Sequence, residues 1–100
     1  MQSDDRITCA TPTRGKKPTR IERWKYQRIR EAILSVVPSD ETGLPFKSLP
    51  SLVAAQLTAE ERKQIGSMSW YTTTVKLDLE TKGLLARVAN VTPQHLRRLK

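Results

Sequence analysis

The sequence predicts an α+β fold, a mainly α-helical domain that ends in a small β-hairpin. Three observations lead to this expectation. Apolar residues recur at helical spacing in several segments, two capping boxes mark helix starts, and Gly83 stops the last helix directly before a short apolar strand. Helix, short strand, further helices and hairpin follow one another as in a winged helix-turn-helix domain. We expect this domain to span residues 19–100, after a flexible basic arm of residues 1–18.

The first half of the domain should contain one long helix and one short strand. The capping box Thr19–Glu22 is expected to open a helix that runs to about Val37, because Pro38 follows and cannot continue it. Apolar side chains at three- and four-residue spacing give this helix one buried side. Leu44–Phe46 is expected as an edge strand, since it contains a proline.

The second half should hold three helical segments and the hairpin. Lys47–Leu57 is expected as a helix whose first turn contains Pro50, and the second capping box, Thr58–Glu61, opens a short helix. The next helix is expected from about Ser69 to Lys82, with Tyr71, Val75 and Leu79 on one side. Strands at Leu84–Ala89 and Gln94–Leu99 then form the wing.

The formal net charge of +8 is unevenly distributed along the chain. Residues 1–30 hold nine Lys and Arg against three acids, whereas residues 31–86 hold five against seven. The last fourteen residues carry four basic groups and no acid. A basic arm and a basic C-terminal edge favour attraction to a polyanion, most simply nucleic acid, although a basic tail can also serve solubility alone.

Several functional classes are not expected. The chain has no long apolar run for a membrane span and no apolar N-terminal signal, so we expect a cytoplasmic protein. Cys9 is the only cysteine and lies in a polar segment, which favours an incidental free thiol. Asp78 should lie near the core and Glu80 should point outward, so the two carboxylates do not converge. With no nucleophile–base pair or phosphate loop, we expect neither an enzyme nor a cofactor or metal site.

The segment WYTTTVKLDLETKG, residues 70–83, resembles a small family of uncharacterised, mainly bacterial winged-helix-like proteins. Those proteins carry a WW-x-x-TVQLDLEAKG-type segment, and weaker similarity extends over residues 18–98. Thr73 stands where the family commonly has lysine, and Leu96 where it has tryptophan. The resemblance implies the winged-helix fold and brings no established activity with it.

Our first functional hypothesis is binding of double-stranded DNA by a transcription regulator or accessory factor. In this fold the helix before the wing enters the major groove, while the wing and an arm contact phosphates. The expected DNA contacts are Thr72, Thr73 and Lys76 on that helix, Arg87, Arg97 and Arg98 on the wing, and Lys16, Lys17 and Arg20 in the arm.

The alternative hypothesis is a winged helix that binds a protein partner or a second copy of itself without nucleic acid. Trp70 and Leu77 share a second apolar stripe, which either packs inside the domain or meets another subunit. Trp24 falls between arginines on the outer side of its helix. It could stack on a base, contact a partner, or receive the C-terminal strand, and the last is the reading we favour.

Overall fold

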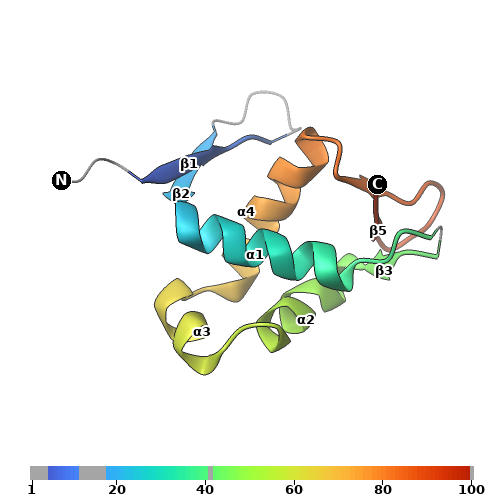
Figure 1. Ribbon diagram of the computed structural model, residues 1–100. Helices are drawn as coiled ribbons and strands as arrows, with labels where there is room; N and C mark the ends of the chain where they lie inside the picture. The colour runs from blue at the N-terminus through green and yellow to red at the C-terminus, as the bar shows by residue number, and fades with distance from the viewer. Residues whose placement is uncertain (1–4, 12–17, 41, 100) are drawn as a thin grey trace.

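The structure is a computed structural model that describes residues 5–11, 18–40 and 42–99, and its long helix α1 lies among all the other elements (Figure 1). The elements in chain order are β1 (Arg6–Cys9), β2 (Thr19–Glu22), α1 (Arg23–Val36), β3 (Leu44–Pro45), the 3-10 turn η1 (Phe46–Ser48), α2 (Leu49–Ala55), α3 (Ala59–Ile65), α4 (Met68–Thr81), β4 (Leu85–Arg87) and β5 (His95–Arg98). The expected α+β architecture is therefore present.

The core forms where α1, α2 and α4 meet. Its fully buried side chains come from the apolar side of each helix and from the sheet, and include Ile29, Ile33, Leu49, Val53, Val75, Leu79, Leu85 and Leu96. Burying a side chain of this size contributes roughly 1.5–3 kcal/mol to folding, so these contacts dominate the stability of the domain. Each of the three helices supplies at least two of them, and this fixes how the helices cross.

Two small antiparallel sheets lie at opposite ends of α1 (Figure 1). Near its N-terminus, β1 pairs with β2. Near its C-terminus the strand order is β3-β5-β4, with Leu44 opposite Leu96 and Ala86 opposite Arg97. Gly43 precedes β3 with φ of +72°, and a Cβ there would lie 2.9 Å from the carbonyl oxygen of Leu96. Only glycine satisfies both the backbone angle and the close approach of the strands.

Most predicted helix boundaries are confirmed to within a few residues. Pro50 lies in the first turn of α2, and Thr58 and Glu61 form the expected reciprocal capping box at the start of α3. The Ser67 side chain accepts the Trp70 amide and caps α4. The Leu44–Phe46 strand appears as β3, and the predicted hairpin appears as β4 and β5.

The predicted start of the first helix is wrong. Thr19–Glu22 is not a capping box but strand β2, and α1 begins at Arg23 without a side-chain cap. Ile21 is buried and pairs with Ile7, so burial of an apolar side chain in the hairpin outweighs the local helix signal. The Glu22 carboxylate lies 3.0 Å from Lys25 Nζ instead of capping an amide.

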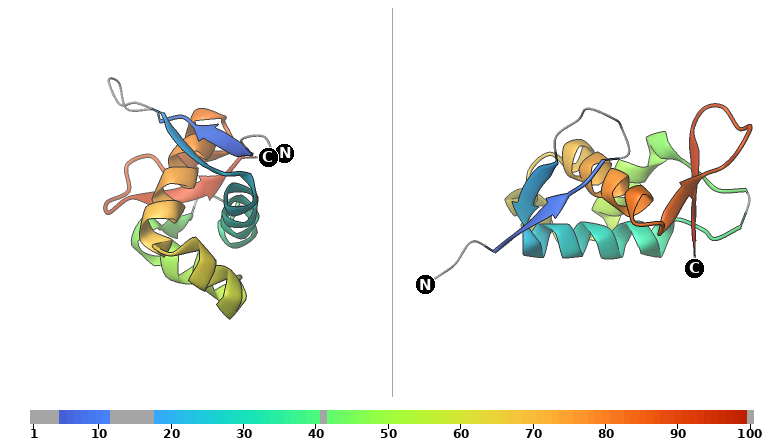
Figure 2. Two further views of the ribbon diagram at one scale, coloured as in Figure 1. Left: turned by 90° about the vertical axis from the view of Figure 1, so that its left-hand side faces the viewer. Right: turned by 90° about the horizontal axis from the view of Figure 1, so that it is seen from above.

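The expected flexible arm of residues 1–18 needs the same correction. Residues 6–9 form a strand, and β1 packs against α4 as well as β2. Figure 2 shows this N-terminal hairpin lying across the α1–α4 pair. The folded domain therefore begins before residue 19. Residues 1–4 and 12–17 lie outside the described part of the chain.

Candidate nucleic-acid interface

The structure overturns the expected base-reading side of α4. Thr72 is fully buried, and Lys76 is only 2% exposed. Lys76 Nζ lies 2.7 Å from the Glu80 carboxylate and 4.6 Å from the centre of the Phe46 ring. Because α4 packs against α1, α2, β1 and β4 together, the part of the helix that carries Thr72 and Lys76 faces the interior. Thr72 and Lys76 cannot contact DNA in this fold.

Glu80 also faces inward, contrary to expectation. Its side chain is 10% exposed and pairs with Lys76, and Arg87 Nε lies 3.6 Å from its other oxygen. Thr73, the third residue expected to touch DNA from this helix, is half-buried. The polar side of α4 is therefore largely neutralised within the protein.

Asp78 is the best-connected buried polar group of the described residues. It accepts a hydrogen bond from Tyr26 Oη at 2.6 Å and one from the Ala10 amide at 2.9 Å, and Lys82 Nζ binds the same carboxylate. Burial raises the pKa of Asp78, but the bonds from Lys82, Tyr26 and Ala10 outweigh it and hold the pKa below its usual value. The group joins β1, α1 and α4. The four-residue spacing of Asp78 and Lys82 is the sequence signal that could have revealed it.

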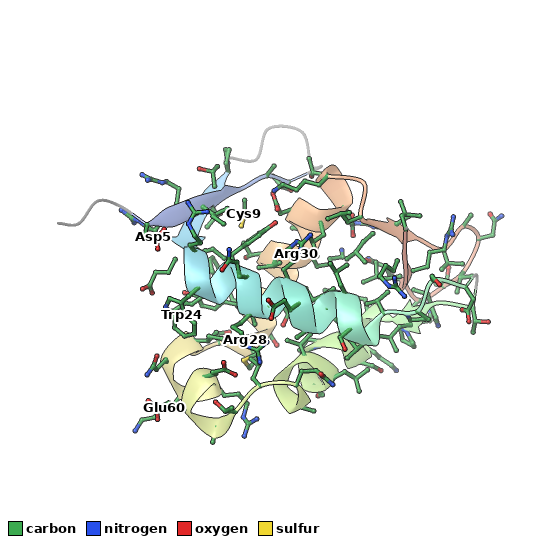
Figure 3. All side chains as sticks on the ribbon, in the orientation of Figure 1. Asp5, Cys9, Trp24, Arg28, Arg30 and Glu60 are labelled. Atoms are coloured by element: carbon green, nitrogen blue, oxygen red, sulfur yellow. The ribbon has the colours of Figure 1, made fainter. Side chains whose placement is uncertain are left out.

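Cys9 lies beside this network rather than in a polar tail. It is buried between the N-terminal hairpin and α1 (Figure 3). Burial, together with the nearby Asp78 charge, raises the pKa of the thiol to about 11. The thiol therefore stays protonated at neutral pH and packs as a small apolar group.

Trp24 does not receive the C-terminal strand, because β5 pairs with β3 and β4 at the far end of α1. The indole is half-buried and packs against the core, with Lys25 Nζ 6.0 Å from its ring centre. Arg28 turns toward α3, where its Nε donates to the Glu61 carboxylate at 2.8 Å (Figure 3). The region around Trp24 is thus largely occupied by the protein's own contacts.

The three arginines of the β4–β5 hairpin have different environments. Arg98 Nε donates to the Val37 carbonyl at 3.3 Å, so it joins the end of α1 to β5. The Arg87 side chain is 56% exposed despite its contact with Glu80. Arg97 is half-buried, and no hydrogen bond or ion pair links its side chain to another described residue. Arg87 and Arg97 are therefore the hairpin cations with capacity for an external anion.

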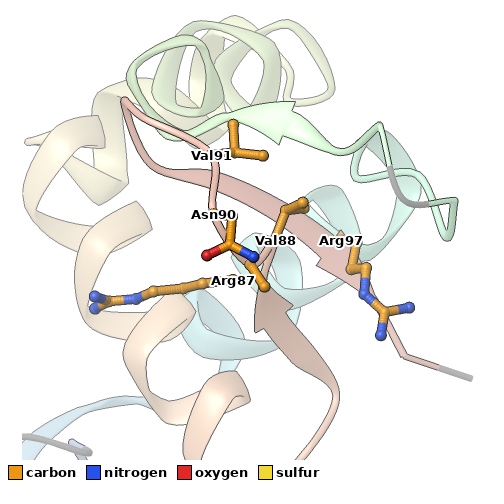
Figure 4. A pocket seen from close by; sticks show the side chains of 6 residues that line it. Arg87, Val88, Asn90, Val91 and Arg97 are labelled. Carbon is orange, nitrogen blue, oxygen red and sulfur yellow. The ribbon is translucent and has the colours of Figure 1, made fainter.

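The hairpin encloses an open hollow of about 480 Å³ lined by Arg87, Val88, Ala89, Asn90, Val91 and Arg97. The side chains of Arg87 and Arg97 point to opposite sides of it (Figure 4). A single small anion cannot be held between two diverging guanidinium groups. The arrangement suits separate contacts along an extended anion.

The one described arm residue that was expected to bind DNA, Arg20, does not lie at the β4–β5 hairpin. Lys16 and Lys17 lie outside the described residues. Arg20 lies on β2 opposite Thr8, in the sheet at the other end of α1 from the wing. The seven of these nine residues that the structure describes thus do not form one surface.

The two predicted interaction residues of α4 do remain at the surface. Trp70 is 47% exposed and Leu77 is half-buried, and neither packs against the core. They lie at three- and four-residue spacing with three threonines, so the five share one side of the helix. We call this set the outer strip of α4: Trp70, Thr73, Thr74, Leu77 and Thr81.

Residues 5–11, 18–40 and 42–99 contain neither a membrane-spanning helix nor a cluster of metal ligands. No helix there combines the length and the apolar character that crossing a membrane requires. The same residues hold no group of three or more His, Cys, Asp or Glu side chains placed to bind a metal ion.

No curated protein and no solved structure gave a significant match to the chain. One protein family does match, over residues 6–96, and its matched region begins at β1 and ends within β5. The N-terminal hairpin therefore lies inside the family's common region. Because nearly the whole chain is covered, the protein belongs to DUF6958, a family of unknown function.

Proposed function

We propose that this protein is a winged-helix module that binds the phosphate backbone of double-stranded DNA with its wing end, without reading bases through α4. We define the wing end as residues 42–48 and 83–99, which hold β3, η1, β4 and β5. The strand order β3-β5-β4, with α2 and α4 packed beside it, supports the winged-helix assignment.

The observation that carries the proposal is the distribution of charge in space. The wing end contains Lys47, Arg87, Arg97 and Arg98 and no Asp or Glu. At the other end of α1 three cations have acidic partners, with Arg23 bound to Asp5, Lys25 to Glu22 and Arg28 to Glu61, whereas at the wing end only Arg87 is in contact with an acid among the described residues, Glu80. An unbalanced positive surface attracts a polyanion, whereas paired charges contribute little to such a field.

Binding of this kind is expected to be strongly dependent on salt and weakly dependent on DNA sequence. Lysine and arginine contacts to phosphate release counterions and carry no direct sequence information. The groups that could have read bases from α4, Thr72 and Lys76, are enclosed. A regulator that needs one operator is therefore less well supported than an accessory factor that binds duplexes generally.

The test is fluorescence anisotropy with a labelled random duplex over a series of salt concentrations. Lys47→Ala and Lys63→Ala form a matched pair, because both lysines are exposed and without a hydrogen bond or ion pair to another described residue. Lys47 lies at the wing end and Lys63 on α3. Lys47→Ala and Arg97→Ala should each weaken binding and reduce the salt slope by about one. Lys63→Ala should have a smaller effect on both.

A second substitution tests base reading. Lys76→Met should lower the free energy of unfolding and leave DNA affinity unchanged, because Lys76 is buried. If Lys47→Ala and Lys63→Ala reduced DNA affinity equally, the net charge of the protein, rather than the wing end, would account for the binding. The absence of binding at low salt would reject the proposal outright.

A second candidate function is binding to a protein through α4. The specific observation in its favour is the exposed Trp70 side chain, whose ring contacts Tyr71 edge-on at 4.8 Å between centres. An exposed tryptophan next to an uncharged helix side is typical of interaction surfaces.

A further inference from the structure

The described residues cover the outer strip of α4 only in part: Trp70 and Thr81 are exposed, whereas Thr73, Thr74 and Leu77 are half-buried. Figure 2 shows α1 lying along one side of α4, and the hydrogen bond from Tyr26 to Asp78 marks that side. Lys76 marks the side toward η1, through its contact with Phe46. By their spacing on the helix, Trp70 and Leu77 fall between these two sides, and neither joins the core. Among the described residues, nothing packs over the exposed part of the strip, which centres on Trp70, and a partner can contact it there.

The strip carries no charge, and this limits what can cover it. Its five members are one tryptophan, one leucine and three threonines. The chain as a whole carries a net charge of +8, so two copies repel each other wherever basic surfaces would meet. An uncharged surface allows two copies to touch without placing cations face to face. A strongly acidic partner could form no ion pair with the residues of the strip.

The order of residues in the strip is self-complementary. Trp70 and Leu77 are separated by two helical turns, about 10 Å, and the small Thr73 and Thr74 lie between them. When two copies of α4 cross antiparallel about a twofold axis between Thr73 and Thr74, each Trp70 faces Leu77 of the second copy. The threonines at the centre allow the two helices to approach closely. A twofold interface requires this kind of matching between a surface and itself.

We propose that two copies of this chain form a symmetric dimer through the outer strip of α4, with the twofold axis between Thr73 and Thr74. Trp70 of each copy is the main anchor and packs on Leu77 of the other. The contact involves none of the wing-end cations and goes beyond the proposed DNA contact. Thr81 lies at the C-terminal end of the strip, and its hydroxyl donates to the Leu77 carbonyl of its own helix.

The position of the axis gives a direct chemical test. A residue beside a twofold axis lies close to its own copy, so a single cysteine there can form a disulfide between two copies. In the Cys9→Ser background, Thr74→Cys should cross-link rapidly on mild oxidation. Ser51→Cys, at an exposed position on α2, is the matched control and should remain monomeric. Equal rates of cross-linking for both variants would overturn the proposed axis.

Sedimentation equilibrium tests the surface without any added cysteine. Trp70→Ala and Leu77→Glu should each weaken dimerisation at least tenfold, roughly the effect of losing an interface anchor. Leu52→Glu is the control, since Leu52 is also an exposed apolar residue but lies on α2. Circular dichroism establishes that each variant is folded, and Thr73→Lys replaces any variant that is not. A wild-type protein that stays monomeric, or a dimer that survives both strip substitutions, would contradict the proposal.

Discussion

At the scale of single residues, Asp78 joins three parts of the chain that are distant in sequence. Its carboxylate binds the Ala10 amide after β1, the Tyr26 hydroxyl on α1 and the Lys82 ammonium at the end of α4. Hydrogen bonds to a buried charge are stronger than those between neutral groups. The N-terminal hairpin therefore depends on a residue that lies almost seventy positions later in the sequence.

Replacing Asp78 by Asn keeps the shape of the side chain and removes its charge. We expect Asp78→Asn to lower the free energy of unfolding by about 2–3 kcal/mol, the usual range for losing hydrogen bonds to a buried charge. Urea denaturation measures this change, and hydrogen exchange should show faster exchange of the Ala10 amide.

The matched control for this change is Asp40→Asn. Asp40 is exposed, and its oxygen accepts from the Thr42 and Gly43 amides, a role that the asparagine oxygen can retain. Asp40→Asn should change the free energy of unfolding by no more than about 0.5 kcal/mol. Equal unfolding midpoints for the two variants would show that the Asp78 charge is not important for the fold.

At the scale of elements, α3 is held by Glu61 in two ways. Its carboxylate accepts the Thr58 amide at the helix start, and it also accepts two hydrogen bonds from Arg28 on α1. Arg28 additionally donates to the Gln56 carbonyl at the end of α2. One ion pair therefore fixes the relative positions of three helices.

The pH dependence of stability follows from this ion pair. The bonds from Arg28, together with the Thr58 amide, lower the pKa of Glu61 from 4.5 to about 2. A depressed carboxylate pKa stabilises the folded state at pH values above the unfolded pKa, and this contribution is lost as the pH falls toward the folded pKa. We expect the free energy of unfolding to fall between pH 4.5 and about 2.

The comparison of Glu61→Gln with Glu60→Gln isolates the contribution of the Glu61 ion pair to the pH dependence of stability. Glu61→Gln should be less stable than wild type at neutral pH, and the difference should shrink as the pH approaches 2 in acid titrations followed by thermal unfolding. Glu60→Gln should follow wild type, because Glu60 is exposed and accepts from the neutral side chain of Gln64. Parallel curves for all three proteins would contradict the assignment.

The sequence predicted the positions of the helices and strands better than the contacts that each of them makes. The periodicity of Tyr71, Val75 and Leu79 correctly identified one side of α4, and the capping residues located α3 and α4. Periodicity shows which side of a helix is apolar but does not show how many neighbours the helix has. Lys76 looked exposed because a lysine is rarely buried, and its pairing with Glu80 became visible only in the folded chain.

The N-terminal hairpin shows a second limit of local patterns. Thr19–Glu22 has the residues of a capping box, yet it pairs with β1 across a connection of nine residues. The partner strand decides the outcome, because Ile7 and Ile21 lie opposite one another in the hairpin and Ile21 is buried there. The proposed contacts of the wing end required the fold as well, since Lys47 and Arg97 lie fifty positions apart.

At the scale of the whole molecule, the net charge of +8 acts in opposite directions on the two proposed interactions. DNA binding gains from the positive charge and should weaken as salt screens it. Dimerisation through an uncharged strip is opposed by repulsion between the two copies, so screening should strengthen it. Two affinities of one protein are thus expected to change in opposite senses over the same salt series.

Anisotropy with labelled duplex and sedimentation equilibrium without DNA measure the two affinities between about 0.05 and 0.5 M NaCl. The dissociation constant for DNA should rise across this range, and that for the dimer should fall. Arg97→Ala should reduce the salt dependence of DNA binding and leave the dimer intact. Leu77→Glu should abolish self-association and leave the salt dependence of DNA binding unchanged. Self-association that weakened with salt would require ionic contacts, which the five uncharged residues of the outer strip cannot make.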